Sequence, residues 1–172
     1  MPQPVNPRTK RGYDNANRRA GSEGTRRRIL EAARALFVAN GYRATTVAMI
    51  SEAAGVHVDT LYRLVGRKPE ILRELIELAI SGGDQPLAPE ERDYVQRMQA
   101  EADAGHQLDI YAEATVAIQT RMAPLFLALR DAGSTEAEAE RVWTEIGVRR
   151  ASNMRRLVRA LGPGALRPGL SV

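Results

Sequence analysis

Apolar residues recur at helical spacing along most of the chain and divide its first part into short segments. Apolar side chains from Ile29 to Phe37 fall at positions i, i+4, i+7 and i+8, which is one face of a helix. This pattern predicts a helix over about 25–40 that ends at Gly41, since glycine commonly terminates helices. Two shorter helices are predicted on either side of Gly55.

Capping residues bound these two short helices. A hydroxyl at Thr45 or Thr46 accepts hydrogen bonds from the free amides of a first turn, and Gly66 closes the second helix. Two helices joined across a small residue form the helix-turn-helix pattern, in which the second helix presents its N-terminal residues to the major groove. Two small helices of an ordinary bundle have the same spacing, so the pattern alone leaves both interpretations open.

The next helices are bounded by proline and glycine. Pro69 suits the first turn of a fourth helix, which stops at Gly82-Gly83. A further helix is predicted to start at Pro89 and to be interrupted at Gly105.

The last two predicted helices are long. Pro124 is expected to break or kink the first of them, because proline lacks an amide hydrogen and clashes with the preceding turn. This helix ends at Gly133. Thr135 and Glu138 have the T-x-x-E spacing of a capping box, which opens a helix ending near Leu161.

Together these segments predict an all-α protein in three parts. Residues 1–23 contain prolines, glycines and asparagines without apolar periodicity and are expected to form a disordered basic arm. Residues 24–70 form the predicted helix-turn-helix domain, and residues 71–172 form a second helical region.

The charge is divided unevenly between the two halves. Residues 1–70 carry 13 Lys/Arg and 6 Asp/Glu, a net +7, whereas residues 71–172 carry 12 and 15, a net −3. This asymmetry favours a polyanion binder joined to a different module, although a solvated basic tail gives the same distribution.

The residue types present exclude several function classes. The sequence has no cysteine, which excludes disulfides, cysteine-ligated metals and thiol nucleophiles, and His57 and His106 are too few for a three-histidine metal site. It contains none of the G-x-S-x-G, P-loop and H-E-x-x-H motifs, so we expect no enzyme, no metal and no cofactor. Neither a membrane span nor a signal peptide is visible, which favours a cytoplasmic protein.

A known combination of submotifs occurs, in order, along about 50 contiguous residues. Their sequence is RRILEAARALFVANGYRATTVAMISEAAGVHVDTLYRLVGRKPEILRELIE. The submotifs are Phe37, Gly41-Tyr42, Thr46, Ile50, Ala53, Ala54-Gly55-Val56, Thr60-Leu61-Tyr62, Gly66 and Lys68. The stretch resembles the N-terminal domain of tetracycline-repressor-like (TetR) transcriptional regulators. The later segment YAEATVAIQTRMAPLFLALRDA is similar to one subgroup of the family.

The resemblance implies a dimeric repressor that binds a double-stranded DNA operator and is released by a small-molecule effector. Residues 71–172 would then be the effector-binding and dimerisation domain. In the family, two further helices follow a segment like LRPGLSV and pair in the dimer, whereas this sequence stops at Val172. We therefore expect a truncated chain with a weakened dimer, and the alternative function is a DNA-binding module without a working sensor.

The resemblance also implies which residues contact DNA. Thr46 matches a position that caps the second helix and contacts phosphate, and Lys68 matches a lysine that binds a phosphate. Tyr62 could instead seal the edge of the domain, and Lys68 could be solvated. The positions that face bases or phosphates from the recognition helix are Val58, Asp59, Thr60, Tyr62 and Arg63.

Three features modify this expectation. His57 stands where the family mostly has serine or threonine, and because histidine caps poorly, the helix is expected to fray or its imidazole to reach a phosphate. Val58-Asp59 replaces a frequent lysine–glycine pair, and Asp59 repels phosphate unless it accepts from a cytosine amino group. The arginines of the basic arm could enter an adjacent minor groove.

Bulky side chains of the second region are candidates for an effector site. Ordinary core packing explains such stripes, but a gap opened by Pro124 and adaptable methionines would also suit a pocket. His106 is expected on the surface. Arg149 and Arg150 either meet an acidic effector or belong to a solvated or salt-bridged face. The ligand-binding candidates are Met98, Tyr111, Met122, Phe126 and Trp143, with Tyr94 among the same bulky set.

Overall fold

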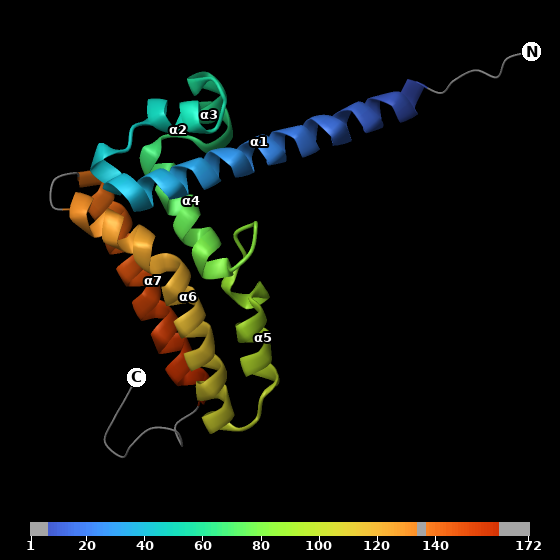
Figure 1. The fold of residues 1–172 in the computed structure, drawn as a ribbon. Helices are drawn as coiled ribbons and strands as arrows, with labels where there is room; N and C mark the ends of the chain where they lie inside the picture. Colours follow the sequence, from blue (N-terminus) through green and yellow to red (C-terminus); the bar gives the residue numbers. More distant parts are fainter. Residues whose placement is uncertain (1–6, 134–136, 162–172) are drawn as a thin grey trace, which may run out of the picture.

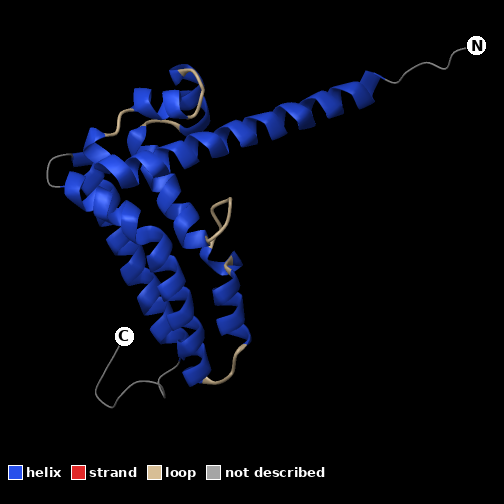
Figure 2. Cartoon of the chain, in the orientation of Figure 1, coloured by secondary structure: helices blue, strands red, loops and turns tan. Residues whose placement is uncertain are grey.

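A computed structural model describes residues 7–133 and 137–161, which form helices joined by loops (Figures 1 and 2). The predicted all-α fold is confirmed: the described residues contain no strand. In chain order the elements are α1 (Pro7–Ala44), α2 (Val47–Ala53), α3 (Val58–Val65), α4 (Lys68–Ser81), the 3-10 helix η1 (Pro89–Glu91), α5 (Asp93–Ala100), α6 (Ala104–Gly133) and α7 (Ala137–Leu161).

The first helix differs from the prediction at its N-terminal end. Gly41 has φ 77° and ψ 167°, so the regular helix stops there as predicted, although α1 is assigned as far as Ala44. Toward the N-terminus, α1 continues back to Pro7 and projects beyond the rest of the protein (Figure 1), so the expectation of a disordered arm is wrong for residues 7–23. After Pro7 this segment contains no proline, and helix propagation needs only one backbone hydrogen bond per added residue.

The two adjacent threonines before α2 have different roles. The Oγ1 atom of Thr46 accepts from the backbone N–H of Met49 at 3.2 Å, which makes Thr46 the N-cap of α2. Thr45 is buried, and its hydroxyl donates to the carbonyl oxygen of Gly41 at 2.8 Å. One hydroxyl therefore begins α2 while the other secures the end of α1.

The region around α5 also differs from the prediction. Pro89 opens a single 3-10 turn rather than a long helix, and Gly105 lies inside the first turn of α6 instead of interrupting a helix. The start of α6 is fixed by Asp103, whose Oδ1 accepts from the backbone N–H of His106 at 2.9 Å. This backbone hydrogen bond lowers the pKa of Asp103, because it favours the ionised carboxylate.

Pro124 does not break α6. The helix is assigned from Ala104 to Gly133 with Pro124 inside it, so the predicted break does not occur. A proline removes only one amide from the helical ladder, and the fully buried side chains of Leu125 and Leu129 hold the following turn in the core.

The last helix, α7, ends at Leu161 as predicted. Thr135 of the expected capping box lies outside the described residues. Met154 of this helix is exposed, and its sulfur accepts a hydrogen bond from the hydroxyl of Tyr111. Buried residues of α7 are Ala139, Val142, Ile146 and Leu157.

One hydrophobic core connects the helix-turn-helix region to the second region. α6 packs against α1, α4, α5 and α7, and the buried faces of α1 and α4 contribute to the same cluster as those of α6 and α7. The core therefore passes through the predicted boundary at residue 70. Within the described ranges, none of the helices combines the length and apolar character that crossing a membrane requires. The central members of this core are Ile29, Phe37, Ile71, Leu72, Leu75, Ile76, Met122, Leu125, Leu129 and Val142.

Candidate nucleic-acid interface and pocket

Helix α3 begins at a histidine cap. The Nδ1 atom of His57 accepts from the backbone N–H of Asp59 at 3.3 Å, so this histidine does cap the helix. Asp59 lies in the first turn, where a negative charge interacts favourably with the helix dipole. The same Nδ1 atom lies 3.3 Å from the carboxylate of Asp59, and a protonated imidazole would exchange the cap for this ion pair.

The inner and outer faces of α3 are clearly separated. Leu61 and Val65 are buried against the core, whereas the side chain of Tyr62 remains 47% exposed. Asp59 and Arg63 are exposed as well, and with Tyr62 they occupy the spacing i, i+3, i+4 that forms one helix face. Val58 and Thr60 are half-buried at the edge of this face. The structure thus brings the predicted recognition residues together on one outer surface.

Lys68 is held in place by Tyr42. Its Nζ donates to the backbone carbonyl of Tyr42 at 3.1 Å and lies 4.2 Å from the centre of the tyrosine ring, a cation–π arrangement. The half-buried lysine thus fastens the start of α4 to the end of α1. An ammonium group has three donors, so a phosphate contact by Lys68 stays a prediction that this structural role does not preclude.

Two further arginines, which were not predicted as contact residues from the sequence, flank this surface. Arg43 follows Tyr42, and Arg67 precedes Lys68. Both are exposed, and neither guanidinium forms an ion pair with a carboxylate of the described residues, although the backbone N–H of Arg67 donates to Glu70. Thr46 is exposed at the start of α2, close in sequence to Arg43. The surface beside α3 therefore combines hydroxyl and guanidinium donors, which are the groups that contact DNA phosphates. Counting charges around the helix-turn-helix would have indicated these arginines.

Residues 29–75 match the family model described as bacterial regulatory proteins, tetR family. The chain therefore carries the DNA-binding domain of tetR-family transcriptional regulators over these residues. The matched range runs from the middle of α1 through α2 and α3 into α4, so it contains the surface described above. No curated protein and no solved structure gives a significant match to the chain.

The last helix that the tetR-family match reaches, α4, is linked by ion pairs to the helices on both sides. Glu74 pairs with Arg26 of α1 at 2.6 Å. Burial raises the pKa of Glu74, and the neighbouring Arg26 only partly opposes the rise. On the other side, Arg73 of α4 pairs with Glu145 of α7 at 3.2 Å.

A second ion pair between α4 and α7 joins Glu77 to Arg149. Of the two alternatives for Arg149, the salt-bridged one is therefore observed. Glu77 also lines a cavity, so this pair stands at the junction between the DNA-binding region and the interior of the second region.

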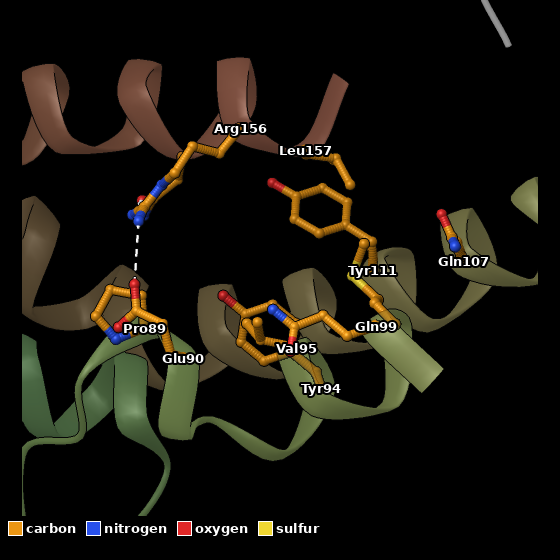
Figure 3. A pocket seen from close by; sticks show the side chains of 11 residues that line it. Pro89, Glu90, Tyr94, Val95, Gln99, Gln107, Tyr111, Arg156 and Leu157 are labelled. Carbon is orange, nitrogen blue, oxygen red and sulfur yellow. Dashed lines mark hydrogen bonds and ion pairs between the residues drawn. The ribbon is translucent and has the colours of Figure 1, made fainter. Parts of the chain in front are cut away.

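Two adjoining cavities lie between α5, α6 and α7, and the second of them extends to Glu77 and Ile80 of α4. One has a volume of about 480 Å³ and the other about 450 Å³, and they share lining residues, including both tyrosines of this region. Figure 3 shows Arg156 and Leu157 of α7 facing Glu90 and Tyr94 across the first cavity. Arg156 bridges the two walls by an ion pair with Glu90 at 3.2 Å. The residues common to both cavities are Pro89, Tyr94, Tyr111, Asn153 and Arg156.

The predicted ligand-binding residues divide into two groups. Met98 and Tyr111 line the first cavity, and Tyr111 and Met122 line the second. Phe126 and Trp143 line neither cavity; their rings stack with centroids 4.2 Å apart beside the core.

The polar groups of the cavities were not predicted as a set. Asn153 accepts from Arg156 at 2.6 Å, and the hydroxyl of Tyr111 donates to the sulfur of Met154 at 2.8 Å. Tyr111 lies far in sequence from the three residues of α7, and single polar positions on amphipathic helices give no signal of a shared cavity. His106 is exposed as expected, and the described residues hold no cluster of metal-ligating side chains.

Proposed function

We propose that this regulator is a repressor that binds its operator as a homodimer and is released by a small molecule held between α5, α6 and α7. The observation that carries the proposal is the position of Glu77, which lines the second cavity and belongs to α4, the helix that directly follows the recognition helix.

The proposed DNA contact rests on the exposed face of α3. Tyr62, Arg63 and Asp59 point away from the core, and the major groove of B-DNA is wide enough to admit one helix. Two copies would read two half-sites about 34 Å apart, which is one turn of the duplex. This arrangement would make a palindromic operator the preferred site.

Apolar side chains exposed on the second region support association of two copies. On α6, Val116 is 67% and Leu127 is 51% exposed, and on α7, Val148 is 65% exposed. A second copy that covered these side chains would remove apolar surface from water. Sedimentation across a concentration range tests this part: a monomer that persists at micromolar concentration on operator DNA would contradict it.

Release would follow from coupling between the cavity and α4. A ligand that changes the separation of α4 and α7 would alter the Glu77–Arg149 pair and with it the orientation of α3, which directly precedes α4. Because the two half-sites have a fixed separation, a small change in the spacing of two recognition helices weakens binding. The ligand must prefer the conformation that does not bind DNA, otherwise no release occurs.

The test begins with selection of genomic fragments bound by the purified full chain. The selected fragment is then labelled, and fluorescence anisotropy follows its release during titration with a small-molecule library. A reporter gene placed behind the fragment shows the sign of regulation. We expect a ligand to release the protein from the fragment and to derepress the reporter gene. If no ligand changes DNA binding, the protein is a DNA-binding module without a sensor, and the proposal is overturned.

A further inference from the structure

Arg92 is a buried cation that has no acidic partner within the part of the chain that the structure describes. It lies at the start of α5, and only 6% of its surface is exposed. Its Nη2 atom donates to the carbonyl oxygen of Leu87 at 3.3 Å, but its buried Nε atom has no hydrogen-bond partner. No carboxylate of the described residues forms an ion pair with it. An arginine is almost never fully buried unless it is paired, so this guanidinium has an unmet requirement for an anion.

The neighbouring acidic side chains are engaged elsewhere. Glu90 pairs with Arg156 of α7, and the carboxylate of Glu91 accepts from the backbone N–H of Ala88 at 3.0 Å. Glu77, the acid that lines the same cavity as Arg92, pairs with Arg149. None of these three carboxylates therefore neutralises the charge of Arg92.

Apart from its charged side chains, the cavity beside Arg92 suits the apolar part of a ligand. Arg92 lines the cavity of about 450 Å³, and Arg150 in the same lining has no carboxylate partner among the described residues either. Aliphatic and aromatic side chains form much of the remaining wall, with polar groups such as Gln119 and Asn153 among them. A fitting occupant therefore combines a large apolar part with a compact negative group. The apolar lining comprises Ile80, Leu87, Tyr94, Tyr111, Ile118, Met122 and Ile146.

We propose that the effector is an organic monocarboxylate whose carboxylate pairs with Arg92 and whose hydrocarbon part fills the cavity between α4, α6 and α7. This inference rests on the proposed function, because it names the chemical class of the effector. The planar guanidinium matches a carboxylate with two parallel hydrogen bonds, and such charge-assisted contacts are stronger in a site shielded from water.

The first test compares acids with neutral isosteres on the unaltered protein. Isothermal titration calorimetry would use 4-phenylbutyrate against 4-phenylbutanamide, and decanoate against decan-1-ol. Saturable binding of at least one acid, about tenfold or more tighter than its neutral counterpart, is expected. Absence of saturable binding by both acids, or equal binding by acid and neutral isostere, would overturn the proposal.

The second test replaces the cation. Arg92→Met keeps a long apolar side chain and should weaken acid binding about tenfold or more, whereas Arg92→Lys should retain part of it. Arg97→Met is the matched control, because Arg97 is an exposed arginine of α5 that pairs with Asp93 and Glu113 outside both cavities. Unchanged acid binding by Arg92→Met would also overturn the proposal.

Thermal unfolding separates a binding role from a structural one. Without ligand, Arg92→Met should melt at the same temperature as the original protein or higher, because it no longer buries an unpaired charge. A lower Tm would instead make Arg92 a structural residue and contradict the assignment.

Operator release measured in the same samples keeps the two proposals distinct. Acid binding that depends on Arg92 but leaves the operator bound would overturn the proposed function and support this inference. Release by a neutral library compound, with no acid binding, would support the function and overturn the inference.

Discussion

The Nε atom of Arg121 on α6 donates to the carbonyl oxygen of Ala79 in the last turn of α4, at 2.8 Å. The backbone carbonyl of Arg121 in turn lies 3.4 Å from Nη2 of Arg34 on α1. Carbonyl groups in the last turn of a helix lack partners within the helix, so Arg121 satisfies one of them from outside. This contact attaches the end of α4 to the helix that lines both cavities.

Replacement of Arg121 by methionine should therefore weaken the protein and its response to ligand. The loss of one charge-assisted hydrogen bond is expected to lower the free energy of unfolding by about 1–3 kcal/mol. Urea denaturation measures this change. Arg155→Met is the control, since Arg155 is exposed and has no partner among the described residues; equal stability of the two variants would contradict the role of Arg121.

Tyr62 should contribute to DNA binding but not to folding. Because nearly half of its side chain is exposed, Tyr62→Ala should change stability by less than about 0.5 kcal/mol. Affinity for the selected operator should fall about tenfold, as measured by fluorescence anisotropy at fixed salt. Tyr62→Phe separates the hydroxyl from the ring, and undiminished affinity of the alanine variant would remove Tyr62 from the interface.

Lys68 should show both a structural and an electrostatic effect. Lys68→Met removes the ammonium that bonds the Tyr42 carbonyl and should lower stability by about 1 kcal/mol. If the same group also binds a phosphate, the slope of log affinity against log salt concentration should become shallower by about one. Destabilisation with an unchanged slope would limit Lys68 to its structural role.

Glu74 should make stability depend on pH. Its pKa in the folded protein lies above the ordinary value of 4.5, so the folded state binds a proton more readily than the unfolded chain. Stability should consequently decrease as the pH rises through 4.5 toward the raised pKa. Urea denaturation in steps from about pH 4 to 7 should show a smaller decrease for Glu74→Gln; parallel profiles would contradict the shift.

Deletion of residues 1–21 should weaken binding to all DNA sequences and flatten its salt dependence. The segment carries Arg8, Lys10, Arg11, Arg18 and Arg19. Residues 7–21 belong to α1, and an α-helix with side chains is about 10–12 Å across, whereas the minor groove is about 6 Å wide. We therefore expect this helical part to contact phosphates from outside the groove. Titrations of both forms at several salt concentrations decide the matter, and unchanged slopes would exclude the contact.

The sequence predicted the helix-turn-helix well because its signals are local. Thr46 and Gly66 act on the turn next to them, and the inward positions Leu61 and Val65 follow from helical periodicity alone. Gly105 misled the prediction because a glycine near a helix start resembles one that ends a helix. The real break is made by Asp103, which caps α6 two residues earlier.

The cavities could not be predicted in the same way. Arg92, Tyr111 and Arg156 come from different helices, and their proximity depends on how α5, α6 and α7 pack. The bulky residues Phe126 and Trp143 gave the stronger apolar signal, yet they stack beside the core. Helical periodicity identifies which face of a helix points into the protein. It does not show whether that face contacts packed side chains or lines a cavity.

The continuous core has a practical consequence for engineering. A chimera that joined the family-matched residues 29–75 to a foreign sensor would remove α6 and α7 from the core that contains Leu72 and Leu75, and it would divide α4 in the middle. Each orphaned leucine would expose side-chain surface worth about 1.5–3 kcal/mol of burial. A transplant of DNA specificity should therefore exchange only the outward positions of α3 and leave the backbone intact.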